Sequence, residues 1–363
     1  MRVLHALNEL RSSGAEIRLF HALPHFDKEG IEPIMLSTGE NEGEFANQYR
    51  SAGITVYHLP FRRKASYTRD FYKLIKRNRI DLVHLHAERA NFVLGMTSRG
   101  AGAKVVRTVC NVFAYEGKLR VIRRIERVIL RLLGIRHISI GPSVEKNEIN
   151  RMANPTTRVD NWIGPQFRPP TFEERSSARA SFKVPENAIV IATVGNCSEV
   201  KNHQAVLEAL GLLAGRFSQP LIYLHAGHGQ MEAQERDLAK NLREAAEIRF
   251  LGTVRDVQQL LWASDIYCMP SLYEGVGNAA LEALACGVPA VLADVPGLRD
   301  ISAPAAGVRF VEPTAAGVAE GTLNILKDPE AARASVAQVA EKVRAERSAE
   351  KAVGTMVQIY QSV

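Results

Sequence analysis

The stretch DIYCMPSLYEGVGNAALEALACGVPAVLADV, residues 265–295, contains two apolar runs separated by a glycine-containing loop and an alanine-rich segment. The runs DIYCMPS (265–271) and PAVLADV (289–295) predict strands. The segment NAALEALACG (278–287) predicts a helix that ends at Gly287, because Pro289 follows it and cannot continue a helix. A strand, a helix and a second strand in this order predict a βαβ unit of a parallel sheet.

The same alternation of strands and helices continues on both sides of this unit. In the first half, apolar runs predict strands at residues 2–7, 32–37, 54–59, 81–86, 104–109 and 136–141. In the second half, further predicted strands lie at residues 188–195, 220–227, 247–254 and 307–312, with helical segments such as 201–215 and 232–245 between them. Residues 161–177 contain a glycine and several prolines and predict a linker. We therefore expect two Rossmann-like, doubly wound α/β domains, residues 1–165 and 166–345, whose strand ends face a cleft.

Length and composition exclude several classes of protein. The chain has 363 residues, 46% of them hydrophobic, which is enough for two cores. No run approaches the roughly 20 apolar residues of a membrane span. The opening MRVLHALNELRSSG also lacks the apolar core and cleavage site of a signal peptide, so we expect a cytoplasmic protein. The four cysteines (Cys110, Cys197, Cys268 and Cys286) show no C-x-x-C spacing, so we expect buried free thiols and neither a metal site nor a disulfide.

Charge is distributed unevenly along the chain. The formal net charge is +7, but residues 1–165 hold 27 Lys and Arg against 16 Asp and Glu, a net +11, whereas the remainder is net −4. The basic excess is concentrated in residues 61–79 and 118–136. In the second of these stretches, apolar and basic side chains recur on opposite sides at helical spacing, which predicts a basic amphipathic helix. The apolar set is Val121, Ile122, Ile125, Val128, Ile129, Leu132 and Leu133, and the basic set is Arg120, Arg124, Arg127 and Arg131.

Two arrangements fit this helix. In an ordinary α/β domain, it would bury its apolar side on the sheet and expose its arginines to water. The same arginines would attract anionic lipid headgroups, which gives a peripheral position on the inner face of the cytoplasmic membrane as the second expectation. Nucleic acid is not expected as a partner, because neither basic stretch interleaves aromatic residues that would stack on bases.

Glycine-containing turns follow several predicted strands. The segment RSSGAEIRLF (11–20) places Gly14 at the start of a helix, where free backbone amides favour a phosphate. The segment TVGNCSEVKNH (193–203) places Lys201 near another helix start, where its ammonium would neutralise a phosphate. The chain has neither the G-x-G-x-x-G spacing of a dinucleotide fold nor a P-loop, so no NAD, ATP or other cofactor is expected.

The opening stretch carries two glutamates eight positions apart, Glu274 in the loop and Glu282 in the helix. In a glycosidase, two carboxylates flank one bond, at about 5 Å or about 6.5–9.5 Å. Here a helix N-terminus separates the two carboxylates. This arrangement predicts one elongated ligand, with phosphates over the amides of Val276, Gly277 and Asn278 and a hydroxyl-bearing group at each end. The alternative is that Glu282 is a solvated helix residue and Glu274 a turn residue.

In their order along the chain, these motifs resemble those of the retaining, two-domain glycosyltransferases of family 4, which have the GT-B architecture. The most specific similarity is the block at residues 251–300 with its E-x7-E pair. MRVLHALNELRSSGAE (1–16) is similar to the family's opening strand and Gly-Gly-x-Glu turn, and DLVHLHAE (81–88) to its Asp-x-x-His-x-His strand. DNWIGPQFRP (160–169) resembles the segment that enters the second domain, and VGNCSEVKNH (194–203) the phosphate-binding strand and lysine.

The resemblance implies a function for each matching residue. Glu282 would hold the ribose hydroxyls, Glu274 would contact hydroxyls of the donor sugar, Lys201 would offset the diphosphate charge, and the turn at 253–254 would lie near the base. Glu274 and Lys201 are thus the catalytic candidates. The donor-binding candidates are Gly14, Asn196, Thr253, Val254, Gly275, Val276, Gly277, Asn278 and Glu282.

The implied reaction transfers a hexosyl or N-acetylhexosaminyl group from a nucleotide diphosphate sugar, with a UDP-sugar favoured. The acceptor hydroxyl replaces the nucleoside diphosphate on the same face of the sugar, without a metal. A phosphate oxygen of the leaving group accepts the acceptor proton, so the protein must mainly stabilise the departing diphosphate. The resemblance also implies that residues 346–363 form a helix that crosses back to the first domain, which binds the acceptor.

The chain departs from the family pattern at three positions. The arginine that commonly precedes the lysine is absent, since Asn196, Cys197 and Ser198 occupy that region. The first turn has Ser13 before Gly14 in place of a glycine pair. Cys110 stands where relatives often have a histidine. On the acceptor side, a function of that histidine would be absent or would fall to Asn111, His84 or His86, although burial for structural reasons fits the two histidines equally well.

Two other classes of function remain open. A nucleotide-sugar epimerase of the same architecture would act on the donor without an acceptor. A non-catalytic nucleotide-sugar-binding protein would fit the Cys110 replacement and the missing arginine. Because the first domain is strongly basic, we expect the acceptor to be a lipid-linked or membrane-presented glycan used in polysaccharide or glycolipid biosynthesis.

Overall fold

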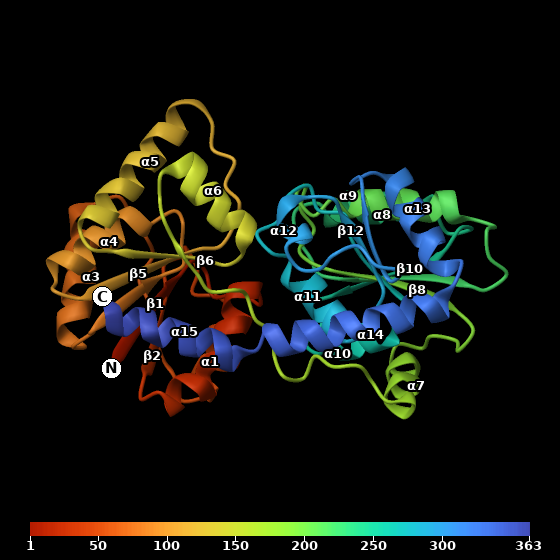
Figure 1. The fold of residues 1–363 in the computed structure, drawn as a ribbon, viewed down its shortest axis with the longest axis horizontal. Coiled ribbons are helices and arrows are strands. Elements are labelled where there is room, and N and C mark those ends of the chain that lie inside the picture. Colours follow the sequence, from red (N-terminus) through yellow and green to blue (C-terminus); the bar gives the residue numbers. More distant parts are fainter. The chain divides into compact units, whose positions relative to one another are not determined.

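The structure is a computed structural model that describes residues 1–363, and it divides into two compact units. One unit comprises Met1–Gly164 together with Arg347–Val363, and the other comprises Pro165–Glu346. The chain therefore passes between the units twice, after Gly164 and after Glu346. Each unit contains one sheet with helices packed on it (Figure 1).

The first unit is built on a seven-stranded parallel sheet in the order β3-β2-β1-β4-β5-β6-β7. The strands are β1 (Arg2–Leu7), β2 (Glu32–Ser37), β3 (Thr55–His58), β4 (Leu82–Leu85), β5 (Lys104–Val109), β6 (Arg136–Ser139) and β7 (Thr157–Arg158). The short edge strand β7 was not predicted from the sequence. The strand order reverses between β1 and β4, so the loops that follow these two strands diverge at the carboxyl edge of the sheet.

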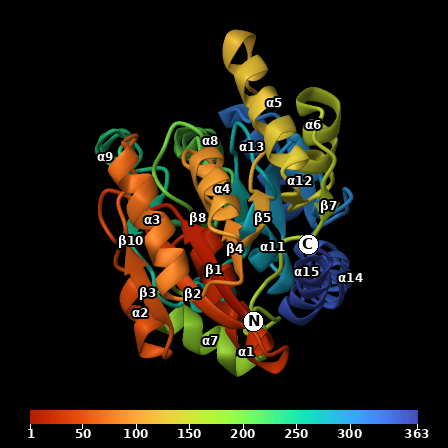
Figure 2. The same cartoon turned by 90° about the vertical axis from the view of Figure 1, so that its left-hand side faces the viewer.

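Helices cover both faces of this sheet, as Figure 2 shows. The helices are α1 (Gly14–Lys28), α2 (Ala46–Ser51), α3 (Ala65–Arg77), α4 (Asn91–Gly100), α5 (Gly117–Leu132), α6 (Pro142–Met152) and α15 (Ala349–Ser362). On one face, buried side chains of β1 pack with those of α1 and α15, including Phe26, Met356 and Tyr360. On the other face, the alternate residues of the strands pack with α3 and α4, including Phe71 and Leu94. The core of the first unit therefore includes the last helix of the chain.

The second unit repeats this design with a six-stranded parallel sheet in the order β10-β9-β8-β11-β12-β13. Its strands are β8 (Ile189–Val194), β9 (Leu221–Ala226), β10 (Glu247–Gly252), β11 (Ile266–Met269), β12 (Ala290–Ala293) and β13 (Val308–Val311). Its helices are α7 (Phe172–Ser181), α8 (His203–Leu213), α9 (Glu232–Lys240), α10 (Val257–Ala263), α11 (Asn278–Ala285), α12 (Pro296–Arg299), α13 (Ala315–Leu326) and α14 (Pro329–Glu346). Two clusters of buried side chains, one on each face, form its core.

The expectation of two doubly wound, parallel-sheet α/β domains is confirmed. The predicted linker at 161–177 is wrong in its last part, because residues 172–177 belong to α7. This helix starts there because the Thr171 side chain accepts a hydrogen bond from the amide of Glu174, while the Glu174 carboxylate accepts one from the amide of Thr171. The prediction of buried thiols is confirmed for Cys197, Cys268 and Cys286 but is wrong for Cys110, which is partly exposed.

The helix predicted at 118–136 is present as α5, but the expected packing of its apolar side is wrong. Leu119, Val121, Ile122, Ile125 and Leu132 are 48%, 57%, 53%, 52% and 78% exposed. Arg127, which was assigned to the basic outer side, is instead 1% exposed. The inward side of α5 thus includes a charged side chain, and the five apolar side chains face away from the core. No helix of the chain is both long and apolar enough to cross a membrane.

Candidate active site

The strand order of the second sheet places two loops side by side. β8 and β11 are neighbours at the point where the order reverses, so the loops that follow them leave from adjacent strand ends. The loops are tied together by the Leu272 amide, which donates to the Val200 carbonyl at 2.8 Å. The Asn202 side chain also donates to the Pro270 carbonyl at 3.1 Å. Residues 195–202 and 270–277 therefore form one continuous surface at the carboxyl edge of the sheet.

An ion pair joins these two loops. The ammonium Nζ of Lys201 lies 2.6 Å from the carboxylate Oε1 of Glu274. The two side chains are 26% and 12% exposed, so both can be reached from solvent. A short contact between opposite charges is a strong hydrogen bond. The two residues that the resemblance names as catalytic are thus in direct contact although 73 positions separate them.

The loop after β11 leads into α11 through a left-handed glycine. Gly277 has φ +73°, and a Cβ at this position would lie 2.5 Å from Cδ2 of Leu298. Only glycine meets both conditions without strain. The neighbouring Gly275 and Val276 are buried, whereas Asn278 is partly exposed at the start of the helix. The N-terminal turn of α11, with its positive dipole end, therefore lies directly beyond Glu274.

Glu282 lies one turn into α11 and is partly exposed. Burial of its carboxyl group nevertheless raises the pKa to about 8. A carboxyl with this pKa is mostly protonated at neutral pH and both donates and accepts hydrogen bonds. The side chain is therefore suited to a neutral hydroxyl-bearing partner.

The other donor-side candidates of this unit lie at the same sheet edge. Asn196 is exposed in the loop after β8, and Thr253 is exposed in the turn after β10. The Thr253 hydroxyl lies 3.1 Å from Nδ1 of His228, which follows β9. Val254 is partly buried next to Thr253. The loops after β8, β9, β10 and β11 thus all contribute polar groups to this edge.

The histidine candidates of the first unit lie at the end of β4. Both ring nitrogens of His84 are engaged, Nδ1 with the Tyr360 hydroxyl and Nε2 with the Thr108 hydroxyl, each at 2.6 Å. His86 is partly exposed, and its Nε2 lies 3.2 Å from Nδ1 of His5. Burial lowers the pKa of both His84 and His86 well below the usual value, so both rings are neutral. Of the two residues, His84 is buried and His86 is partly exposed.

The remaining candidates of the first unit surround the start of α1. Gly14 is the first residue of α1, and the preceding Ser13 hydroxyl donates to the Glu16 carboxylate. Burial raises the pKa of the Cys110 thiol, while the nearby Arg18 guanidinium opposes this shift. The Asn111 side chain accepts a hydrogen bond from the next amide, Val112, at 2.8 Å, so it shapes its own loop.

An ion network beside this edge, mostly buried, was not predicted from the sequence. Glu88, just beyond β4, is 2.5 Å from Nη2 of Arg107 and 3.2 Å from Nη2 of Arg127. Arg127 also binds Glu148 of α6 through a contact of 2.7 Å between Nε and Oε2. The arginines lower the pKa of the Glu88 carboxyl although its burial alone would raise it. A glutamate directly after a strand was visible in the sequence, but nothing there connected it to a helix about 40 residues away.

Two family models match the chain on either side of the unit boundary. Residues 12–139 match the model described as Glycosyltransferase Family 4, and residues 174–343 match the model described as Glycosyl transferases group 1. The chain belongs to the family 4 glycosyltransferases. This identification confirms the family that the motifs indicated, and with it the GT-B architecture of the two sheets.

Known glycosyltransferases are similar to this one over most of its length. The putative glycosyltransferase EpsF of Bacillus subtilis is 23% identical over 81% of this chain and 79% of its own. The capsular polysaccharide biosynthesis glycosyltransferase CapH of Staphylococcus aureus is 24% identical over 78% of each chain. The crystal structure of Anabaena Alr3699/HepE in complex with UDP has a TM-score of 0.85 at 16% identity and covers 100% of both chains. A second structure of that protein contains UDP-glucose.

Proposed function

We propose that this glycosyltransferase is a retaining, metal-independent enzyme that moves a hexosyl or N-acetylhexosaminyl group from a nucleotide diphosphate sugar to an acceptor hydroxyl. The observation that carries the proposal is the contact between Lys201 and Glu274 at the strand reversal of the second sheet, beside the helix that carries Glu282. The ammonium of Lys201, the carboxylate of Glu274 and the carboxyl of Glu282 provide the three kinds of contact that a diphosphate, a sugar and a ribose require.

The donor is proposed to extend across the N-terminal turn of α11. The diphosphate would lie over the amides of the loop at 275–278 and beside the ammonium of Lys201. The ribose hydroxyls would bind the carboxyl of Glu282, and the sugar hydroxyls the carboxylate of Glu274. The base would lie near the exposed turn at Thr253. A UDP-sugar is favoured because the structural relative HepE has been crystallised with UDP and with UDP-glucose.

Donor binding would separate the ion pair that the free protein contains. The incoming diphosphate competes with Glu274 for Lys201, and Glu274 is released to accept hydrogen bonds from the sugar. In the transfer, the bond between the anomeric carbon and the phosphate oxygen breaks, and the acceptor oxygen bonds to that carbon on the same face. The acceptor proton passes to a phosphate oxygen of the leaving nucleoside diphosphate, whose developing charge Lys201 stabilises.

The acceptor is proposed to be a glycan or glycolipid presented at an anionic membrane. The support is the apolar stripe of α5, defined as Leu119, Val121, Ile122, Ile125 and Leu132, which is exposed and flanked by basic side chains. Among these, Lys118 and Arg124 are exposed. A helix with an outward apolar stripe and basic flanks binds at a lipid interface, where the apolar side chains enter the acyl boundary and the basic groups contact headgroups. Polysaccharide biosynthesis is also named for the relative CapH.

The first experiment is a thermal-shift panel of UDP-, GDP- and ADP-sugars, followed by product analysis with the best stabiliser. We expect a UDP-sugar to raise the Tm, an α-linked product from an α-linked donor by NMR, and a rate that added Mg²⁺ or Mn²⁺ does not increase. A β-linked product would refute retention. Conversion of the donor without any acceptor would favour an epimerase instead. Binding of a donor with no turnover on a glycan or polyprenyl-linked acceptor panel would favour a non-catalytic protein.

A further inference from the structure

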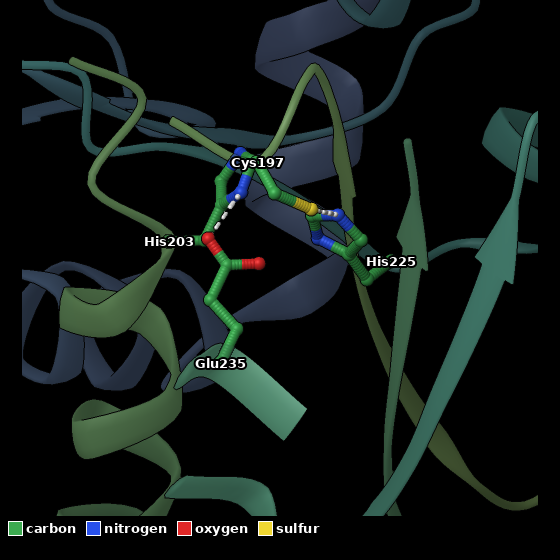
Figure 3. Close-up of side chains that lie close together, drawn as sticks. All are labelled: Cys197, His203, His225 and Glu235. Atoms are coloured by element: carbon green, nitrogen blue, oxygen red, sulfur yellow. Dashed lines mark hydrogen bonds and ion pairs between the residues drawn. The ribbon is translucent and has the colours of Figure 1, made fainter. Parts of the chain in front are cut away.

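Four buried side chains of the second unit converge on one point (Figure 3). Cys197 lies in the loop after β8, His203 is the first residue of α8, His225 lies in β9, and Glu235 lies in α9. Their residues are 1%, 3%, 0% and 4% exposed, respectively. We define these four residues as the Cys-His-His-Glu cluster. None of them belongs to the set assigned to donor binding or catalysis.

Two distances within the cluster are close to those between neighbouring ligands of a metal ion. Sγ of Cys197 lies 3.2 Å from Nε2 of His225, and Nδ1 of His203 lies 3.2 Å from Oε1 of Glu235. One ligand atom from each of the four residues lies within 4.8 Å of the other three. In a tetrahedral zinc site, bond lengths of about 2.0–2.3 Å place neighbouring ligand atoms roughly 3.3–3.6 Å apart. The cluster therefore needs only a small contraction to surround an ion.

One atom of the cluster has no partner. Oε2 of Glu235 is buried and forms no hydrogen bond. A buried carboxylate oxygen without a hydrogen bond is costly, although His203 and the Cys197 thiol stabilise the carboxyl as a whole and lower its pKa. A divalent cation between Glu235, the two histidines and Cys197 would remove this cost.

The surroundings of the cluster orient its ligands. Nδ1 of His225 lies 3.0 Å from the Thr193 hydroxyl and 3.3 Å from the Tyr223 hydroxyl. These contacts turn the opposite nitrogen, Nε2, toward Cys197. A second-shell hydrogen bond of this kind is typical of histidines that bind metals. The backbone of Cys197 is fixed as well, since its carbonyl accepts a hydrogen bond from the Met231 amide at 3.1 Å.

A second cluster of histidines in the chain has fewer ligand types for a metal ion. His5, His84 and His86 also lie close together. Both ring nitrogens of His84 are already hydrogen-bonded, and the cluster includes neither a thiol nor a carboxylate. It thus has no complete donor set, whereas the Cys-His-His-Glu cluster has four protein ligands.

We propose that Cys197, His203, His225 and Glu235 bind one zinc ion. Sulfur, two imidazoles and a carboxylate are a donor set that zinc accepts, and four protein ligands leave no open position for a substrate. The ion is structural. It joins the loop after β8 to α8, β9 and α9. Two of its ligands bracket Lys201 in the sequence, so the metal fixes the loop that presents this lysine. Only this positioning effect rests on the proposed function, whereas metal binding does not.

The test measures metal in the full-length protein directly. After expression in zinc-supplemented medium and extensive dialysis, elemental analysis should find about one zinc per chain. Cobalt exchanged into the same protein should give the near-ultraviolet charge-transfer band of a thiolate ligand and the strong visible bands of tetrahedral coordination. Less than one-tenth of a zinc per chain, or octahedral cobalt without a thiolate band, would overturn the proposal even if no variant folds.

Variants then locate the ion. Cys197→Ser and Glu235→Gln should each lower the zinc content at least tenfold, whereas Cys268→Ser, another buried cysteine on β11, should retain it. Zinc that persists in both cluster variants but is lost in His86→Gln would place the metal in the other cluster and refute the assignment. Chelated wild-type protein should lose thermal stability and regain it with zinc. Donor binding distinguishes the two proposals: zinc binding without donor binding refutes only the proposed function.

Discussion

At the scale of single residues, burial gives the two glutamates of the E-x7-E pair different chemistry. Glu274 is paired with Lys201 and reaches solvent, whereas burial of the Glu282 carboxyl raises its pKa. Nucleoside diphosphate binding would exploit both properties, because the anion takes over the lysine and the neutral hydroxyls meet the protonated carboxyl. In the proposed complex, the two glutamates would therefore make separate contacts with the donor and would not act as an acid and a base on one bond.

Glu274→Ala and Lys201→Ala are expected to reduce turnover by different routes. Lys201→Ala removes charge that stabilises the leaving diphosphate, so kcat should fall about 100-fold or more. Glu274→Ala releases Lys201 for phosphate but removes a sugar contact, so nucleoside diphosphate binding should persist or strengthen while kcat falls. Calorimetry with UDP and steady-state kinetics measure the two effects. Glu330→Ala, an exposed change on α14, is the control. Equal loss of UDP affinity in both variants would contradict this assignment.

Glu282→Gln should stabilise the free protein at alkaline pH. The pKa of Glu282 rises from 4.5 to about 8 in the folded protein. Between these values the folded protein retains a proton that the unfolded chain has lost, so this group lowers the stability as the pH rises from 4.5 to 8. The Tm advantage of Glu282→Gln over wild type should therefore grow across this range and level off above it. Thermal unfolding at several pH values measures this difference in Tm, with a substitution of an exposed glutamate, Glu341→Gln, as the control. A pH-independent difference would disprove the raised pKa.

Much of the candidate site could be anticipated from residue types and strand ends, but its contacts could not. Lys201 and Glu274 each follow a predicted strand, yet their contact depends on β8 and β11 being neighbours, which no local pattern specifies. The Cys-His-His-Glu cluster was not predicted from the sequence for the same reason. Its members come from a loop, two helices and a strand, with none of the short spacings that mark a zinc site in a sequence.

At the scale of elements, α5 shows what periodicity can and cannot predict. Its spacing predicted a helix with two unlike sides, and the helix is there. Periodicity does not say which side faces inward. That depends on Glu88 and Glu148, whose carboxylates bind Arg127 and draw this arginine of α5 toward the domain. Breaking such a pair is costly because it leaves a buried charge uncompensated, so the network holds the apolar stripe outward.

Charged substitutions in the apolar stripe should abolish lipid binding without unfolding the protein. Ile122→Asp with Ile125→Asp replaces two isoleucines that are 53% and 52% exposed, so the fold should persist. Burying one isoleucine side chain contributes about 1.5–3 kcal/mol, and partitioning into vesicles of phosphatidylglycerol and phosphatidylcholine should therefore fall at least about tenfold. Vesicle co-sedimentation at low and high salt measures this partitioning.

The matched control for the stripe is Ile149→Asp. Ile149 is 47% exposed on α6 and lies outside the stripe. Its replacement should leave vesicle binding unchanged. Equal loss in the control and in the stripe variant would mean that added negative charge, and not the stripe, explains the effect. Absence of binding by the wild type at low salt would refute the membrane surface altogether.

At the scale of the whole molecule, the alternation of strands and helices was enough to predict two doubly wound sheets. The strand orders follow the common pattern in which the first strand lies near the centre and the order reverses beside it. The sequence could not show that α15 lies in the first core, because its apolar periodicity would fit a helix on either sheet. Its place there depends on side chains such as Met356 and Tyr360 fitting against α1 and β4.

Removal of the last helix should unfold the first unit selectively. A chain that ends at Glu346 uncovers the core face on which Val353, Met356 and Tyr360 pack, and it removes the partner of His84. Hydrogen exchange should then be fast throughout residues 1–164, while the sheet of 165–346 stays protected. A chain that ends at Tyr360 loses only the last three residues, of which Gln361 and Ser362 are exposed, and should behave like the full-length protein. Uniform loss of protection would show that the units do not unfold separately.

The two passages of the chain between the units also determine the order in which the protein can be completed during synthesis. Domains usually fold as they emerge, with the N-terminal one first. Here the second unit has all its residues once Glu346 has left the ribosome, whereas the first unit still lacks α15. The half of the protein that is made first therefore finishes last. Its uncovered apolar face stays available to chaperones on the nascent chain until α15 has been made.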